Sequence, residues 1–204
     1  MMRTATLRTS ATWLLVGCVA APMAEAQWGV SLEARRVVFG GTSVDTTAGN
    51  DRQSFRPTAS MVYGLRLDRR VGRTSVALAA RLATAGLVLR RADAFAGLSG
   101  EFLVFEAAPE AVYRLATTRS GARLHAYAGP VIGLWLFGGE NARAVPGAAA
   151  GLIGEFGLTG RLTLWLRGGG ALTRSVFERA ELPPEFLLRA TRRGEIAIGL
   201  RYGR

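Results

Sequence analysis

The chain contains no lysine, and only one cysteine and one histidine occur among its 204 residues. All 26 basic residues are therefore arginines, and they stand against 15 acidic residues. The net charge of +11 is carried by planar guanidinium groups, which pair with carboxylates and phosphates. A single cysteine excludes a disulfide scaffold. Apolar residues make up 49% of the chain and charged residues 20%, which excludes an intrinsically disordered protein because enough apolar surface can be buried.

The sequence also lacks the common signatures of catalytic and cofactor sites. It has no P-loop and no dinucleotide-binding fingerprint, and its one histidine and one cysteine are too few for a His/Cys metal site. Glu106 and Glu110 would lie about 13 Å apart on one strand face. That spacing exceeds the roughly 5 to 9.5 Å between the carboxyl groups of a glycosidase. We therefore predict no catalytic residue, no metal and no cofactor.

No apolar run reaches the roughly 20 residues that a membrane-spanning helix needs. The longest run, from Ala11 to Ala21, follows Arg3 and Arg8 and precedes the small-x-small sequence Ala24-Glu25-Ala26. This arrangement is typical of a cleaved secretory signal. We predict a signal peptide over residues 1–26.

A second interpretation of the N-terminus remains open. Leu15-Val16-Gly17-Cys18 is similar to a lipoprotein box, in which Cys18 would be acylated and become the first mature residue. Under the signal-peptide interpretation, residues 27–204 form one mature domain without cysteine.

The mature domain alternates large apolar residues with small or polar ones, and a period of two indicates β-strands. Leu162, Leu164 and Leu166, for example, alternate with Thr163 and Trp165. Eight such segments are predicted, over residues 27–39, 55–68, 73–89, 99–115, 122–137, 146–157, 160–173 and 191–202.

The connectors between these segments alternate in length. The long connectors are predicted at 40–54, 90–98, 138–145 and 174–190, and the short ones at 69–72, 116–121 and 158–159. Outer-membrane barrels have short periplasmic turns and longer external loops, so this rhythm favours a barrel with both ends in the periplasm.

Two architectures place the apolar strand face in opposite directions. A soluble periplasmic, calycin-like barrel binding a small apolar ligand would have it inside, whereas a membrane barrel would turn it toward lipid. The opposite face is rich in glycine, alanine, serine and threonine with scattered arginine and glutamate, which suits a narrow lumen crossed by ion pairs. We therefore predict an all-β fold, an eight-stranded antiparallel up-and-down transmembrane β-barrel, and keep the soluble barrel as an alternative.

With its signal, its eight amphipathic strands and its last strand Glu195–Tyr202, the sequence resembles the small eight-stranded outer-membrane barrels of Gram-negative bacteria, the class of the OmpA transmembrane domain. The resemblance implies an outer-membrane location and a final strand that the barrel-assembly machinery recognises by a terminal aromatic residue. Tyr202 fits that role, although Gly203 and Arg204 follow it. Lipid A deacylases of this architecture have a serine two residues after a histidine on one strand, whereas Ala126 and Tyr127 follow His125 here.

Charged residues on the predicted inner face must be paired, because an unpaired buried charge costs several kcal/mol. We predict a lumen ion-pair network made of Glu106, Glu110, Arg123, Glu155, Arg167, Glu195 and Arg201. The same alternation places further polar side chains inside, namely Glu33, Arg35, Arg66, Arg81, Arg114, His125 and Arg161.

The arginines are spread over nearly every strand and loop, so no nucleic-acid patch is expected. Arg90, Arg91, Arg192 and Arg193 lie near the predicted outer rim and are candidate contacts for lipopolysaccharide. The expected partners are thus outer-membrane lipid, lipopolysaccharide and the barrel-assembly machinery, around a monomer. The predicted function is a structural or interaction role; an enzyme acting on outer-membrane lipid is the alternative, and it would need a serine close to His125 in space.

Overall fold

Eight long strands form the body of the molecule in the computed structural model, which describes residues 27–203 except 41–42, 46–52, 59, 92–93, 138–141, 182–183 and 185. The predicted signal peptide and Cys18 lie outside the described residues. The eight strands are β1 (Gln27–Phe39), β4 (Ser60–Val71), β5 (Thr74–Arg91), β6 (Ala94–Thr117), β7 (Arg123–Leu136), β8 (Ala142–Gly157), β9 (Leu162–Thr173) and β11 (Thr191–Gly203).

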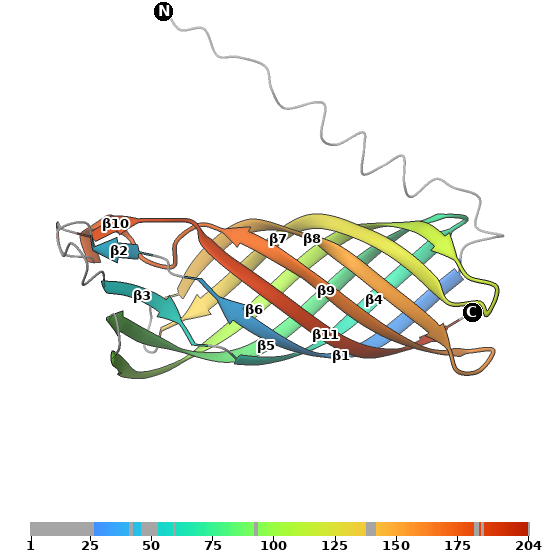
Figure 1. The fold of residues 1–204 in the computed structure, drawn as a ribbon, viewed down its shortest axis with the longest axis horizontal. Helices are drawn as coiled ribbons and strands as arrows, with labels where there is room; N and C mark the ends of the chain where they lie inside the picture. The colour runs from blue at the N-terminus through green and yellow to red at the C-terminus, as the bar shows by residue number, and fades with distance from the viewer. Residues whose placement is uncertain are drawn as a thin grey trace, which may run out of the picture.

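These strands close into a barrel. Each strand pairs antiparallel with its neighbour in the chain, and β1 pairs both with β4 and with β11. The closing seam runs from Gly29 opposite Gly203 to Phe39 opposite Arg193. The predicted eight-stranded antiparallel barrel is confirmed (Figure 1).

Three tight connectors lie at one end of the barrel, which we call the turn end: residues 72–73, 118–122 and 158–161. The start of β1 and the end of β11 lie at this same end (Figure 1). The connector between β4 and β5 has only two residues and begins with Gly72 at a φ of 61°. A glycine at the first central position is the signature of a type II′ hairpin turn, which matches the twist of the flanking strands.

The opposite end, which we call the loop end, carries three short strands and one helical turn. They are β2 (Ser43–Asp45), β3 (Gln53–Pro57), β10 (Phe186–Leu188) and the 3-10 turn η2 (Arg179–Glu181). The strand β10 pairs with β2, and β2 pairs with β3. The connector before β4 and the connector before β11 are therefore joined by main-chain hydrogen bonds (Figure 1).

Two sequence predictions about this end are wrong. The predicted external loop 90–98 is largely strand, because β5 and β6 continue their ladder up to Arg91 opposite Ala94. The predicted strand 55–68 is broken, since β3 takes over the pairing with β5 where β4 stops. The first error arises because main-chain hydrogen bonds extend a ladder regardless of side-chain polarity, on which the predicted boundaries depended.

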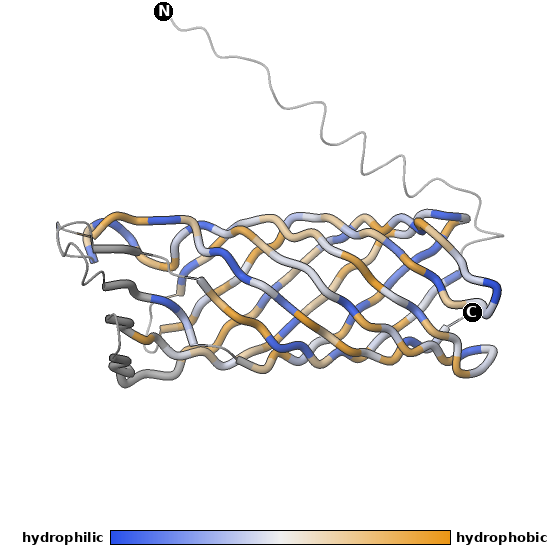
Figure 2. Tube along the Cα trace, in the orientation of Figure 1, coloured by the Kyte–Doolittle hydropathy of each residue, from blue (hydrophilic) through white to orange (hydrophobic). Residues whose placement is uncertain are grey.

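The two faces of the barrel wall differ sharply. Aliphatic side chains point outward, and Ile196 and Leu32 are 73% and 66% exposed. Figure 2 shows the apolar and polar residues alternating along the strands. Because the leucine and isoleucine faces lie outside, the alternative of a soluble barrel with an apolar core is wrong. Within the described part of the chain there is no helix with the length and apolar character needed to span a bilayer.

Several aromatic residues near the strand ends are exposed on the barrel's outer surface. Trp28, Tyr63, Tyr113, Phe156 and Tyr202 are all between 43% and 62% exposed. Phe137 is an exception, because its ring packs against Phe102 and Trp135 inside the wall, with centroids 4.8 and 6.2 Å away.

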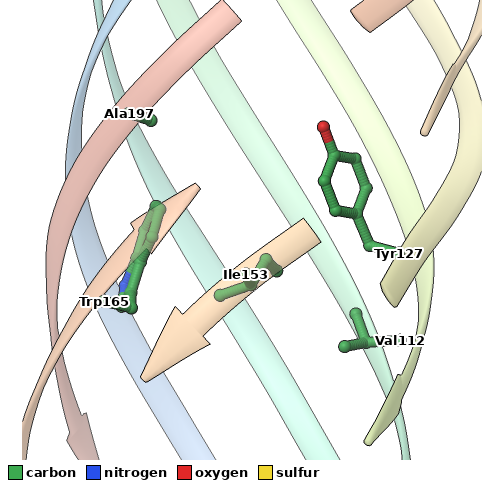
Figure 3. Packing of buried hydrophobic residues seen from close by; sticks show 5 residues of the cluster. All are labelled: Val112, Tyr127, Ile153, Trp165 and Ala197. Atoms are coloured by element: carbon green, nitrogen blue, oxygen red, sulfur yellow. The ribbon is translucent and has the colours of Figure 1, made fainter. Parts of the chain in front are cut away.

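The apolar part of the interior is small. Its main cluster consists of Val112, Tyr127, Ile153, Trp165 and Ala197, one residue from each of five neighbouring strands (Figure 3). Five strands are thereby packed against one another in the middle of the wall, beside the charged groups described below.

Gly199 makes room for Trp165, and this predicts a steric effect. A Cβ at Gly199 would lie 2.5 Å from Trp165 Cε2 and 2.6 Å from the carbonyl oxygen of Leu32. We expect Gly199→Ala to lower the free energy of unfolding by about 1–3 kcal/mol, measured by urea titration of the folded barrel. Gly168→Ala is the matched control, because a Cβ there meets nothing within 4 Å. Equal losses in the two variants would contradict the steric explanation.

Candidate functional site

The middle of the lumen holds buried ion pairs centred on Arg81 of β5. Its Nη1 donates to Glu106 at 2.8 Å, its Nη2 to Glu110 at 2.8 Å and its Nε to Glu33 at 2.5 Å. Arg81 is only 4% exposed. One guanidinium therefore ties β1, β5 and β6 together, and its planar fork suits three acceptors in different directions. Because Glu106 and Glu110 contact two nitrogens of the same guanidinium, their carboxyl groups lie much closer together than the separation of about 13 Å predicted from strand rise, and that part of the prediction is wrong.

Glu195 of β11 is a second centre, on the opposite side of the lumen from β6. Arg35 donates to it at 2.6 Å, the Tyr127 hydroxyl donates at 3.0 Å, and Arg167 lies 3.3 Å away. Arg167 also donates to Glu110 at 2.7 Å, which joins this centre to the first. Its guanidinium carbon lies 3.5 Å from the Tyr127 ring centroid, a cation–π contact.

A third group of charges lies nearer the turn end. Arg201 Nε donates to Asp68 at 2.9 Å, and Arg70 donates to Asp68 at 3.2 Å and to Glu155 at 3.0 Å. His125 Nε2 lies 3.2 Å from Glu155. The only histidine of the chain thus lies beside the Glu155 carboxylate, which already accepts a hydrogen bond from Arg70.

Six of the seven residues predicted for the lumen network are buried and lie in ion pairs: Glu106, Glu110, Glu155, Arg167, Glu195 and Arg201. The seventh, Arg123, is exposed at the turn end. It lies opposite Glu155 across β7 and β8, but no ion pair between them is formed in the described part of the chain.

The other side chains predicted on the inner face divide in the same way. Glu33, Arg35, Arg66, Arg81 and His125 are buried. Arg114 is half-buried, and Arg161, beyond the last rung of β9, is exposed.

Three members of the network were missed by the sequence prediction: Asp68, Arg70 and Arg193. Asp68 and Arg70 continue the alternation of Arg66 along β4, and Arg193 continues that of Glu195 along β11. The alternation of residues was therefore enough to find them, but the predicted strand boundary assigned Arg70 to a turn. Arg193 was predicted at the outer rim because it lies near the start of the predicted strand 191–202.

The four candidate lipopolysaccharide contacts do not all lie on the outer surface. Arg193 is not at the outer surface, because its guanidinium pairs with Glu106 inside the lumen, so this part of the prediction is wrong. Arg192 points outward and is exposed. The side chains of Arg90 and Arg91 lie outside the described residues. The role of Arg192, Arg90 and Arg91 stays a prediction.

Toward the loop end the lumen becomes apolar. Val176, from the connector between β9 and β11, is fully buried against Ala85, Trp135 and Val145. The hollow beside this cluster has a volume of about 30 Å³. The connector is thus anchored to the interior by an inserted side chain.

Arg143 of β8 holds the same connector through hydrogen bonds, and it lies on the strand face that also carries the buried Val145. Its Nη1 and Nη2 donate to the two oxygens of Glu181 at 2.8 and 2.6 Å, and it also donates to the Val176 carbonyl. These hydrogen bonds lower the pKa of the Glu181 carboxyl below its usual value of 4.5. The stabilisation is therefore fully present above that usual value and is lost as the pH falls through the lowered one.

We expect Arg143→Gln to speed tryptic cleavage after Arg174, Arg179 and Arg189, measured by limited proteolysis of the folded barrel at neutral pH. Global stability should change by less than about 1 kcal/mol, because Glu181 is exposed to solvent. Arg192→Gln, an exposed arginine near the same rim, is the control. An unchanged cleavage rate in Arg143→Gln would show that this pair does not hold the connector.

His125 and Ser75 line the same hollow of about 260 Å³ at the turn end. No hydrogen bond joins these two described side chains. No group of three or more metal-ligating side chains occurs in the described part of the chain.

No family model and no curated relative matches the chain. Among solved structures it is similar to the outer membrane protein AlkL in lipid bilayers, with 13% identity, a TM-score of 0.53 and coverage of 91% of this chain and 93% of that one. The chain has the fold of a small outer-membrane β-barrel. Neisserial surface protein A is 14% identical, with a TM-score of 0.48 over 86% of this chain and 96% of that one. Ail of Yersinia pestis, in complex with the heparin analogue sucrose octasulfate, is 12% identical, with a TM-score of 0.49 over 88% and 99%.

Proposed function

We propose that the protein is a bacterial outer-membrane barrel with a structural or interaction role. The observation that carries this proposal is the closed barrel whose outer wall is aliphatic and whose interior is charged. Leu32, Leu65, Ile132 and Ile198 are at least 50% exposed on different strands. A belt of that kind is stable only against lipid, because monomeric soluble proteins rarely expose contiguous apolar patches of this extent.

We further propose that the lumen does not conduct. An eight-stranded barrel is just wide enough for side chains to fill its interior. Here Arg81, Arg167 and Glu195 bridge opposite walls at mid-height, and Val176 with Trp135 occupies the loop end. Planar-bilayer recording with the purified barrel tests this; steady unitary currents from the wild-type protein would overturn it.

No catalytic role is included in the proposal. The enzyme alternative needs a serine that His125 can deprotonate, and Nε2 of His125 lies against Glu155 instead. Monomeric behaviour is expected, since a closed barrel has no free strand edge to pair with another copy. The barrel-assembly machinery is the proposed partner in biogenesis, with Tyr202 exposed on the last strand as its contact.

Lipopolysaccharide is the proposed partner at the loop end. Arg192 and Arg36 both point outward. They lie on β11 and β1, near the loop end of the closing seam. Guanidinium groups there would pair with the phosphates of the outer leaflet. Arg90 and Arg91 remain candidates for the same role.

The experiment that tests the membrane assignment is fractionation of expressing cells, followed by gel electrophoresis of boiled and unboiled detergent extracts. We expect the protein in the outer-membrane fraction, with a mobility shift between the two samples because the closed barrel resists the detergent until heated. Recovery in the soluble periplasmic fraction without a shift would overturn the proposal.

A further inference from the structure

Three arginines that have no partner among the described residues line the turn end. Arg73 precedes β5, Arg114 lies on β6 and Arg123 begins β7, so they occupy three neighbouring positions around the mouth. Arg114 is half-buried and the other two are exposed. None of the three forms an ion pair or side-chain hydrogen bond within the described chain, whereas the arginines deeper in the lumen are paired.

These arginines line two adjoining hollows. One, of about 260 Å³, is bounded by Arg73, Arg114 and Arg123, and the other, of about 550 Å³, by Arg123 and Arg201. Gln27 and Arg123 belong to both. The larger volume lies within the roughly 300–1,000 Å³ of small-molecule sites.

Among the described residues, few negative charges lie at this mouth. Of the residues that the structure describes, Glu155 is the single carboxylate that lines either hollow, and Arg70 and His125 already engage it. Arg201 is 4% exposed, and its Nη2 donates no hydrogen bond to any described residue. Guanidinium groups gathered on one wall repel one another unless an anion lies between them.

The backbone of this wall also has a β-bulge beside Arg114. Arg114 of β6 lies opposite His125 of β7. The register of this ladder shifts at the next position, between Arg114 and Ala116. The main-chain N–H of Arg114 donates to the carbonyl of Arg73 at 2.8 Å, which fixes the two arginines side by side. Bulges of this kind are frequent next to binding sites, where they redirect a side chain.

We propose that the turn-end mouth is a binding site for a phosphate-bearing anion, held by Arg73, Arg114 and Arg123 with a further donor from Arg201. A phosphate group accepts hydrogen bonds in several directions at once, whereas a carboxylate has only two oxygens in one plane. Donors that come from the β4–β5 turn, β6 and β7 on one side and from β11 on the other fit the first geometry better. Ser75 and Gln27 add neutral polar groups to the same wall.

The test is calorimetric titration of the folded full-length mature barrel in detergent with pyrophosphate, in phosphate-free buffer at low salt. We expect saturable binding that weakens as salt rises, because the recognition is electrostatic. Arg114→Gln and Arg123→Gln should each weaken it about tenfold, the loss expected when one charged hydrogen bond is removed.

Arg119→Gln is the matched control: it removes the same charge from the neighbouring turn 118–122, but Arg119 lines neither hollow. Its affinity should equal that of the wild type, and retained heat-modifiability confirms that each variant is folded. Absence of saturable binding would overturn the proposal, as would equal losses in Arg119→Gln and Arg123→Gln, which would indicate attraction to the net charge alone.

Two further ligands separate the sources of the anion. Water-soluble dioctanoyl phosphatidylglycerol that competes with pyrophosphate, with the same arginine dependence, would identify a lipid headgroup as the occupant. Pyrophosphate binding without such competition would identify a soluble periplasmic phosphate compound. Succinate that binds as tightly as pyrophosphate would overturn the assignment to phosphate.

Discussion

Replacement of Arg81 by methionine is expected to lower the free energy of unfolding by about 3–5 kcal/mol, the usual cost of breaking a buried ion pair by removing one partner. The variant leaves Glu33, Glu106 and Glu110 without their shared guanidinium in the middle of the lumen. Those carboxylates cannot reach bulk water, because the side chains of neighbouring strands surround them. The measurement is urea-induced unfolding of the folded barrel in lipid, followed by tryptophan fluorescence.

Arg119→Met is the control for this prediction, since Arg119 lies exposed in a turn and its loss should change stability by less than about 0.5 kcal/mol. The double variant Arg81→Met/Glu106→Gln should recover part of the loss, because it also removes one of the three carboxylates that share the Arg81 guanidinium. If Arg81→Met unfolds at the same urea concentration as the wild type, the lumen network does not stabilise the barrel.

Replacement of Ile198 by arginine is expected to destabilise the barrel by about 2–4 kcal/mol in lipid, the cost of placing a charged side chain on the lipid face near the bilayer midplane. Ile198 is 50% exposed on the outer wall, midway along β11, between Ala34 of β1 and Leu166 of β9. The measurement is the same unfolding titration in phospholipid vesicles.

Leu158→Arg is the matched control, because Leu158 has a similar exposure of 54% but lies in the turn between β8 and β9. At the edge of the membrane the same substitution should cost only about 0–1 kcal/mol. If both variants lost the same free energy of unfolding, the cost of the arginine would not depend on its depth, and the aliphatic belt would not lie in a bilayer.

These two predictions concern opposite faces of one wall and have one physical origin. In a membrane barrel the lipid solvates the apolar face, so the interior holds the polar residues, and each of them needs a partner. Tyr127 illustrates this arrangement, because its ring belongs to the apolar cluster of Val112, Ile153 and Trp165 while its hydroxyl donates to Glu195. Stability therefore depends on specific ion pairs inside and on aliphatic contact with lipid outside.

Much of the fold and of the lumen network could be predicted from the alternation of residues along the chain. A period of two places Leu162, Leu164 and Leu166 on one face without any knowledge of the partner strands. The same alternation correctly placed Glu106, Glu110, Glu155 and Glu195 inside. It failed where strand ends had to be located, at residues 90–98 and at Arg70, because side-chain polarity does not limit a main-chain ladder.

By itself, then, the sequence determined the fold class, the number of barrel strands and the face on which most charged residues lie, since these depend only on local periodicity. The tertiary structure alone decided which charges pair. Arg81 reaches Glu106 and Glu110, and Arg193 turns inward to Glu106. Arg73, Arg114 and Arg123 have no ion-pair partner among the described residues at the turn end. Pairing depends on the register between strands far apart in the chain, and register is set when the barrel closes, with β1 against β11.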